Sequence, residues 1–277
     1  MKISLFSQSL FALPLREAIE VTASLGFSAI ELACVRPHLD LETARDHPKG
    51  VVEQIQKSGL EVSALSLFNS FTDPTCLNDQ IEAAETYIRL APLFHTQILK
   101  MTPGPPGSAG AEESHWHYLG MALDRLVSVA EGVGVRLAFE THMRQLTDTL
   151  AGAKRFLAMV MSDVVGLTVD FLNLAFAGEK MPDVISSLEG RIYNTHVKNG
   201  TIGEDGSWRF YALDTGLVDY GEVLILLHDI RYSDYLTIEC LGPEAQTRPV
   251  ETAKRDLAIL RRYLKQVEDF NLMPCQG

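Results

Sequence analysis

Four residues with metal-binding or proton-transferring side chains stand at or near the ends of short apolar segments in the second half of the chain. They are Glu140, Asp170, His196 and Glu239. Short apolar segments bounded by polar residues are typical of buried strands. A carboxylate in a buried strand costs several kcal/mol unless it is paired or binds a metal. The pattern therefore indicates a shared site.

Three carboxylates and one imidazole make a ligand set that is mostly oxygen. Three converging negative charges repel one another, and a divalent cation removes that repulsion. Such a set suits Mn²⁺ first, with Mg²⁺, Co²⁺ and Zn²⁺ as alternatives, and does not suit a soft-metal site. The opposing interpretation is that each residue only caps an element, as Asp170 would at a turn, or sits satisfied in the core, as His196 would. Four such residues in register favour one metal ion.

Eight β-type segments position these residues, and each is followed by a segment with helical apolar spacing. In the last helical segment, Ala253, Leu257, Leu260 and Leu264 share one face. Repeated β-then-α units without a long linker predict a (β/α)₈ barrel, an α/β fold, formed as one domain by residues 1–277. The expected strands are Ile3–Phe6, Ala29–Ala33, Glu61–Leu67, Gln97–Met101, Arg136–Glu140, Gly166–Asp170, Ile192–Val197 and Leu236–Glu239.

Two further features bear on the barrel. The first βα turn has no G-x-G-x-x-G, so a dinucleotide site in an open sheet has no support. The stretch from Pro103 to Gly110 follows the fourth expected strand and predicts a mobile loop over the barrel mouth. In a parallel barrel the carboxyl ends of the strands form that mouth, where barrel enzymes keep their active sites.

Composition narrows the partners to a small molecule. The net charge of −12 disfavours nucleic acid and anionic membranes. No apolar run approaches the ~20 residues of a membrane span, and polar residues at positions 7–9 interrupt the N-terminal apolar run, so no signal peptide is expected. Scattered cysteines without a CxxC pair indicate reduced thiols in the cytoplasm. They are Cys34, Cys76, Cys240 and Cys275.

The polar segments resemble the metal motifs of the xylose isomerase-like barrel superfamily, which includes ketose 3-epimerases, inosose isomerases and dehydratases, and endonuclease IV. Further similarity lies in the second-strand entry at residues 26–31 and in the turn into the seventh helix at residues 216–220, so the likeness spans nearly the whole chain. The metal-type motifs are Phe139-Glu-Thr-His142, Thr168-Val-Asp170, Thr195-His-Val-Lys-Asn199 and Thr237-Ile-Glu-Cys240.

The resemblance implies roles for the four residues. As in the 3-epimerases, Glu140 and Glu239 would move protons beside a carbonyl while also binding the metal, and Asp170 and His196 would be ligands alone. The sequence departs from the family at Asn199, where Asp is frequent, and at residues 214–216. We interpret the first departure as a loss of charge near the metal, and the second leaves that loop's substrate contact open.

Other residues are candidates for substrate contact, each with a plainer reading as a loop or core residue. His142 lies two positions past Glu140. Lys198 lies two positions past His196 and so shares its strand face, where it could pair with a carboxylate or a substrate oxygen. The further candidates are Arg36 and His38 after the second strand, Phe68 after the third, and Trp208 on a long loop after the seventh. We interpret His115 and His117 as surface residues. Cys240 should point away from the site.

Three classes of function remain. The first is a sugar isomerase or epimerase that abstracts a proton beside a carbonyl. The second is a dehydratase that uses the same site on an inosose or keto acid. The third is a phosphodiesterase like endonuclease IV, which needs more His and Asp ligands and a basic groove, and the sequence lacks both. Outside these classes stands a barrel without activity, which would bind no metal. A substrate with a phosphate or carboxylate group stays open, because four basic residues could lie near the mouth: Arg36, Lys100, Arg144 and Lys198. Dimers are common in the resembled family, so a homodimer is one expected state.

Overall fold

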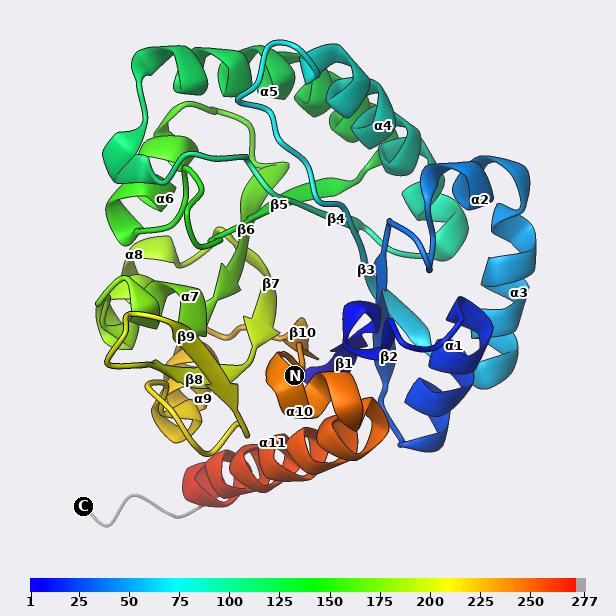
Figure 1. The fold of residues 1–277 in the computed structure, drawn as a ribbon, viewed down its shortest axis with the longest axis vertical. Coiled ribbons are helices and arrows are strands. Elements are labelled where there is room, and N and C mark those ends of the chain that lie inside the picture. The colour runs from blue at the N-terminus through cyan, green and yellow to red at the C-terminus, as the bar shows by residue number, and fades with distance from the viewer. Residues whose placement is uncertain (273–277) are drawn as a thin grey trace.

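The computed structural model describes residues 1–272, in which eight parallel strands close into a barrel surrounded by helices (Figure 1). This confirms the predicted (β/α)₈ fold. Around the barrel the order is β1-β10-β7-β6-β5-β4-β3-β2. The strands are β1 (Lys2–Phe6), β2 (Ala29–Ala33), β3 (Glu61–Ser66), β4 (Ile98–Met101), β5 (Arg136–Glu140), β6 (Val165–Asp170), β7 (Ile192–Val197) and β10 (Tyr235–Ile238).

Helices connect successive strands on the outside of the barrel (Figure 1). Short 3₁₀ turns lie at Ser7–Leu10, Ala91–Phe94 and Ser108–Gly110. The α-helices are α1 (Leu15–Ser24), α2 (Leu41–Asp46), α3 (Pro48–Ser58), α4 (Leu77–Leu90), α5 (Glu113–Val133), α6 (Leu150–Ala158), α7 (Phe171–Phe176), α8 (Met181–Leu188), α9 (Tyr220–Asp229), α10 (Gly242–Thr247) and α11 (Pro249–Leu272).

The expected strands agree with the barrel strands to within one residue at each end. The expected ranges Ala29–Ala33, Arg136–Glu140 and Ile192–Val197 match β2, β5 and β7 without any shift. The last strand, β10, begins and ends one residue earlier than expected, so Glu239 follows it directly. Buried parallel strands carry continuous apolar runs, which is why their positions are readable in the sequence.

The prediction of a plain loop after the seventh strand was wrong. Residues Asn199–Ile202 (β8) and Trp208–Tyr211 (β9) form an antiparallel hairpin outside the barrel (Figure 1). Gly216 approaches this hairpin so closely that a Cβ atom there would lie 2.2 Å from Asn199 Oδ1, and its φ of +152° also favours glycine. Two strands of four residues give too short a pattern to stand out from a polar loop.

Alternation along each strand separates the core from the barrel interior. On β5, Phe139 faces outward and packs on Phe156 of α6, with ring centroids 4.7 Å apart. The next residue, Glu140, therefore faces inward. Part of the interior is filled by an apolar group, and its mouth carries buried polar residues. The apolar group consists of Ala64, Ile98, Ala138 and Tyr193.

The segment after β4, where a mobile loop was predicted, is hydrogen-bonded to its neighbours. Ser108 donates to Asp148 Oδ1 from both its amide (3.0 Å) and its hydroxyl (2.6 Å). The amide of Gly104 donates to Gln145 Oε1 at 2.9 Å. Polar side chains of the β5–α6 loop thus hold a segment whose Pro and Gly content alone suggested mobility.

Within residues 1–272, no helix combines the length and the apolar character that crossing a membrane requires. Cys34, Cys76 and Cys240 are free thiols. Cys275 lies outside the described residues.

Candidate metal centre

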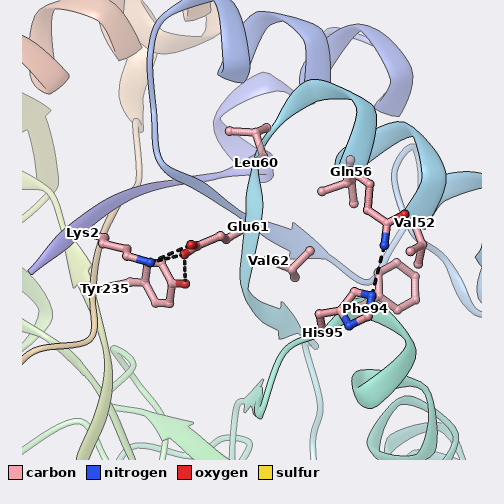
Figure 2. A pocket seen from close by; sticks show the side chains of 10 residues that line it. Lys2, Val52, Gln56, Leu60, Glu61, Val62, Phe94, His95 and Tyr235 are labelled. Carbon is pink, nitrogen blue, oxygen red and sulfur yellow. Dashed lines mark hydrogen bonds and ion pairs between the residues drawn. The ribbon is translucent and has the colours of Figure 1, made fainter.

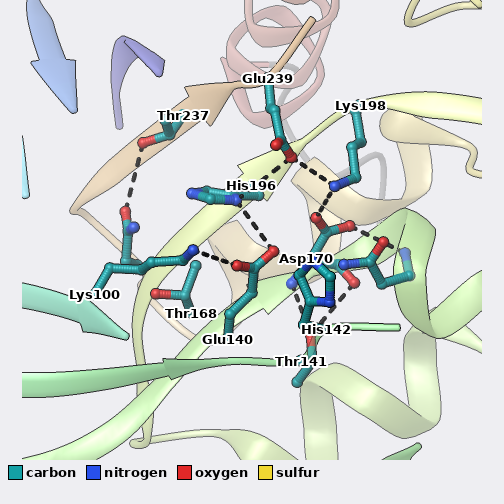
Figure 3. Close-up of polar contacts among 12 residues, drawn as sticks. Lys100, Glu140, Thr141, His142, Thr168, Asp170, His196, Lys198, Thr237 and Glu239 are labelled. Atoms are coloured by element: carbon teal, nitrogen blue, oxygen red, sulfur yellow. Dashed lines mark hydrogen bonds and ion pairs between the residues drawn. The ribbon is translucent and has the colours of Figure 1, made fainter. Parts of the chain in front are cut away.

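Glu140, Asp170, His196 and Glu239 converge at the carboxyl ends of four consecutive barrel strands. One ligand atom of each lies within 4.8 Å of those of the other three. All four side chains are buried, and Glu239 is the most accessible at 7%. Figure 3 shows His196 between Glu140 and Glu239, with Asp170 beside them. These residues are named here the carboxylate–histidine cluster.

Strand ends and turns fix the direction of each side chain in the cluster. Asp170 ends β6 and also caps α7, because its Oδ1 accepts from the amide of Asn173 at 3.0 Å. The capping role considered for Asp170 is therefore present, and it leaves the second oxygen, Oδ2, facing Lys198. After β5, Thr147 donates to the carbonyl of Glu140 at 2.6 Å and turns the chain back over the strand end.

The donor atoms of the cluster fit a divalent cation. His196 Nδ1 lies 3.5 Å from Glu140 Oε1 and 3.7 Å from Glu239 Oε2. It is buried and has no hydrogen-bond partner among residues 1–272. A buried ring nitrogen without a partner costs free energy. Three surrounding carboxylates and one lone pair supply the ligand types that Mn²⁺, Mg²⁺, Co²⁺ or Zn²⁺ bind.

Two buried lysines share the carboxylates of the cluster. Lys100 Nζ lies 2.5 Å from Glu140 Oε2. Lys198 Nζ lies 2.5 Å from Glu239 Oε2 and 2.7 Å from Asp170 Oδ2, so it bridges two carboxylates (Figure 3). The sequence suggested Lys198 as a partner for a carboxylate, and that pairing is present. Lys100 was expected only near the mouth, since a single lysine in an apolar strand does not reveal its partner.

A fourth buried carboxylate, Glu31 on β2, was not predicted as part of the site. Its Oε1 lies 2.8 Å from His196 Nε2, and its Oε2 accepts from Asn194 Nδ2 at 2.9 Å. Glu31 is fully buried. A carboxylate inside the apolar run Ala29–Ala33 was the available signal, but β2 is not adjacent to β7, and only the closed barrel brings the two together.

Burial and crowding shift the pKa values of the cluster. Burial alone raises the pKa of Glu140, but the charges of Lys100, His142 and His196 bring it well below its ordinary value. Burial raises the pKa of Asp170 above its ordinary value. The charge of Lys198 opposes this rise, and the charges of Glu140 and Glu239 add to it. Burial lowers the pKa of His196, but Glu31 and Glu140 raise it to about 10. The site thus carries an excess of negative charge.

Four of the six predicted substrate residues make contacts at the mouth or next to it. Lys198 bridges two cluster carboxylates, and His142 lies beside Asp170 in Figure 3, with Nδ1 2.9 Å from the carbonyl of Met143. Phe68 is 45% exposed, and its ring centroid lies 5.0 Å from Lys100 Nζ. Trp208, on β9, stacks on Phe176 of α7. The guanidinium of Arg144 lies over the Trp208 ring, 4.6 Å from its centroid.

Arg36 and His38 contact other loop residues, and their expected substrate role stays a prediction. Arg36 is exposed and pairs with Asp40 at 2.7 Å and Glu42 at 2.8 Å. His38 is buried, and its two ring nitrogens lie 3.0 Å from Ser7 Oγ and 3.2 Å from the carbonyl of Leu13. With both nitrogens in use, His38 holds together the segments after β1 and β2. The sequence could not separate this structural use from a binding one.

The two departures from the family motif have structural causes. Asn199 Nδ2 donates to the carbonyls of Leu213 and Val218, both at 2.8 Å. A carboxylate cannot donate, so the amide is needed to tie the hairpin to the following loop, whatever its effect on charge. Asp214 pairs with Arg262 at 3.0 Å, on the side of α11.

Cys240, His115 and His117 stay outside the site, as the sequence indicated. The thiol of Cys240 lies 3.7 Å from Asp256 Oδ2, and burial raises its pKa well above the ordinary value. His115 Nδ1 accepts from the amide of Glu112 at the start of α5, and His117 is exposed.

Asn173 and Ser66 are among the further buried side chains near the strand ends that have polar atoms without a partner among residues 1–272. Both amide atoms of Asn173 are unpaired, although the residue is 1% exposed and follows Asp170 in α7. Ser66 Oγ, at the end of β3, is also unpaired and buried. Sequence reasoning missed both, because Asn and Ser at an element end are ordinary.

The opposite end of the barrel holds a separate pocket of about 410 Å³ at the starts of β1, β3 and β10 (Figure 2). Its polar groups pair with one another. Lys2 Nζ lies 2.6 Å from Glu61 Oε1, and the hydroxyl of Tyr235 donates to Glu61 Oε2 at 2.5 Å. Barrel enzymes keep their active sites at the other end, so we assign this pocket to the face that stabilises the barrel.

Comparison with known proteins places the chain in a family. The xylose isomerase-like TIM barrel model matches residues 19–263. A curated relative, the inosose dehydratase of Clostridium perfringens, is 23% identical over 179 residues, which cover 60% of this chain and 59% of that protein. The match therefore spans less than two thirds of the relative's length.

Two solved structures share the fold. The IolI protein with a bound zinc atom is 20% identical, with a TM-score of 0.80, covering 95% of this chain and 99% of that one. L-ribulose 3-epimerase is 19% identical, with a TM-score of 0.79, covering 100% of this chain and 99% of that one. Since the family model covers most of the chain and the barrel agrees with it, the chain belongs to the xylose isomerase-like TIM barrel family.

Proposed function

We propose that this protein is a metal-dependent isomerase or epimerase of a small sugar. The observation that carries the proposal is the convergence of three carboxylates and one imidazole at the mouth of the barrel. The unpaired Nδ1 of His196 supports a cation there. We propose one divalent ion, Mn²⁺ first, with Mg²⁺, Co²⁺ and Zn²⁺ as alternatives. The zinc atom named for the similar IolI structure supports a divalent ion in general.

A divalent ion bound by the cluster would polarise a carbonyl oxygen and stabilise the negative charge that develops when the neighbouring carbon loses its proton. Glu140 and Glu239 come from β5 and from the end of β10, which β6 and β7 separate in the closed barrel. A substrate held between them meets one carboxylate on each side. One carboxylate takes the proton, and the other returns a proton to the opposite face or to the adjacent carbon. The composition of the sugar is unchanged.

Substrate binding is proposed for side chains that surround the cluster. Phe68 would form an apolar wall, and Trp208 would cover the mouth from β9. His142 and Lys198 would meet substrate oxygens beside the reacting carbons. The unpaired amide of Asn173 adds a donor and an acceptor that a sugar hydroxyl can use.

A dehydratase acting on an inosose or a keto acid is the second candidate, and the inosose dehydratase relative favours it. Both reactions begin with loss of a proton beside a carbonyl. Elimination then needs an acid at the leaving hydroxyl, which receives the proton and departs as water. His142 and Lys198 are the groups beside the cluster that could serve.

Metal analysis and solvent-deuterium incorporation test the two candidates. The purified protein, loaded in turn with Mn²⁺ and Zn²⁺, is incubated in D₂O with ketoses, inososes and keto acids. Deuterium in a recovered sugar without loss of water supports the isomerase or epimerase. A product lighter by one water supports the dehydratase. Protein that binds no divalent ion contradicts both.

The cellular setting is also a proposal. The free thiols of Cys34, Cys76 and Cys240 support a cytoplasmic location. Nucleic acid and membrane partners are not expected at a net charge of −12. The homodimer suggested by the family resemblance would be seen by sedimentation velocity.

A further inference from the structure

The two ring nitrogens of His196 lie in different surroundings. Nε2 lies 2.8 Å from Glu31 Oε1, whereas Nδ1 faces Glu140 and Glu239 and has no hydrogen-bond partner in the described chain. A neutral imidazole carries one N–H donor and one lone pair. A metal ion can bind only a nitrogen that carries a lone pair, so an ion in the cluster requires the lone pair on Nδ1 and leaves the proton on Nε2, where Glu31 accepts it. The lone pair then points at the cluster.

Glu31 reaches His196 across the barrel interior. In the closed order, β10 and β1 separate β7 from β2, so strand pairing does not bring the two residues together. Both partners of Glu31 lie on β7, because Asn194 donates to Oε2 at 2.9 Å while Oε1 meets His196. Burying a carboxylate completely is costly unless its oxygens are held. Glu31 is held by two side chains on one face of one strand.

Resting on the metal site proposed above, we propose that Glu31 is a positioning residue for the divalent ion. It holds the imidazole of His196 in the tautomer and orientation that present Nδ1 to the cluster. Metal-bound histidines in proteins are commonly fixed by a carboxylate on their other nitrogen, which also makes the imidazole a better ligand.

The charges in the barrel interior agree with this role. Four buried carboxylates, of Glu31, Glu140, Asp170 and Glu239, face two buried ammonium groups, of Lys100 and Lys198. When the imidazole of His196 is neutral, as in a metal-bound ring, these groups together carry two net negative charges. One divalent ion balances them.

Substitutions at Glu31 separate positioning from charge. E31Q keeps the length but can donate to Nε2 and so allows the wrong tautomer. E31D keeps the charge but is too short to reach the ring. We expect both to weaken Mn²⁺ and Zn²⁺ binding by about 10- to 100-fold, measured by competition with a chelating dye. The control is E61Q at the other end of the barrel, which should bind like the wild type.

A second readout follows the ring itself. In the zinc-loaded wild type, ¹H–¹⁵N correlation spectra of the histidine rings should show one imidazole with its proton on Nε2. The N194A variant keeps every charge of the interior and removes the donor to Glu31 Oε2. We expect it to fold and to lose several-fold in metal affinity, which keeps the test open if a Glu31 variant does not fold.

Several results would overturn the proposal. Wild-type affinity in E31D beside a loss in E31Q would show that only the charge matters. Wild-type affinity in E31Q, or in N194A, would show that Glu31 does not position the ring. A wild-type protein that binds no divalent ion would remove the metal site itself, together with this role. Wild-type affinity in these variants, with metal still bound by the wild type, would overturn this role and leave the proposed function standing.

Discussion

Lys198 is placed so that its loss exposes the repulsion within the cluster. Its ammonium lies between Asp170 and Glu239 and is 4% exposed. Burial lowers the pKa of a lysine, but these two carboxylates raise that of Lys198 above its ordinary value. The side chain therefore stays charged, and each carboxylate depends on it when no cation is bound.

The substitution K198M should destabilise the metal-free protein by about 3–5 kcal/mol, the usual effect of removing one partner of a buried ion pair. Urea denaturation gives the free energy of unfolding. The matched control is K2M, which breaks the solvent-exposed pair with Glu61 and should cost less than about 1 kcal/mol. Equal effects of the two substitutions would contradict the assignment of Lys198 to a buried network.

The substitution E140Q should abolish most turnover even at metal concentrations high enough to keep the site filled. An amide cannot take the proton beside the carbonyl, and loss of a general base typically lowers the rate by about 10²- to 10⁴-fold. Steady-state kinetics on the active substrate, with metal content measured on the same sample, tests this. Near-normal turnover with metal bound would exclude Glu140 as the base.

At the scale of single elements, α2 has a cap that should make its stability depend on pH. Asp40 precedes the helix, and its Oδ1 accepts from the amide of Thr43 at 3.0 Å. Hydrogen bonds from Thr43, and then the nearby Arg36, lower the pKa of Asp40 from 3.8 to about 2. Because the folded-state pKa is the lower one, the contribution is complete above about pH 4 and is lost as the pH falls towards 2.

The variant D40N should therefore differ from the wild type most at neutral pH. Asparagine also caps helices, but it gains no stability from ionisation. The difference in the free energy of unfolding should shrink between about pH 5 and pH 2, as measured by urea denaturation at several pH values. A difference that stays constant over this range would mean that the Asp40 carboxylate contributes nothing by its charge.

Among the elements, the sequence predicts the barrel strands closely and the segments outside the barrel less well. Apolar runs locate the barrel strands because burial on both faces leaves few polar positions. The hairpin of β8 and β9 escaped prediction because each strand has four residues and the pair packs outside the barrel. The hydrogen bonds of the segment from Pro103 to Gly110 could not be predicted, because their partners Asp148 and Gln145 lie on a loop distant in the sequence.

For the molecule as a whole, the bound ion should stabilise the fold. A ligand that binds only the native state at 100 times its Kd adds about 2.7 kcal/mol, which for a chain of this size raises Tm by roughly 5–10 °C. Thermal unfolding in EDTA and in Mn²⁺, at equal ionic strength, tests this. Identical Tm values at saturating Mn²⁺ would mean that the cluster does not hold the ion.

Chain closure also decides which site residues can be predicted. Glu140, Asp170, His196 and Glu239 end four consecutive strands, so their meeting follows from the barrel topology. Glu31 meets His196 only because the sheet closes on itself. The residue pattern of a single strand cannot predict a contact across the barrel interior. The structural use of His38 depends likewise on Ser7 and Leu13, which belong to another loop.

The two buried ammonium groups, of Lys100 and Lys198, have a consequence for the order of events in biosynthesis. Small domains built around zinc stay unfolded until the metal arrives. Here each cluster carboxylate already has a cationic neighbour in the polypeptide itself. The newly made chain can therefore complete its barrel before any ion binds, and under the proposed function a shortage of metal would yield a folded, inactive protein ready for later loading.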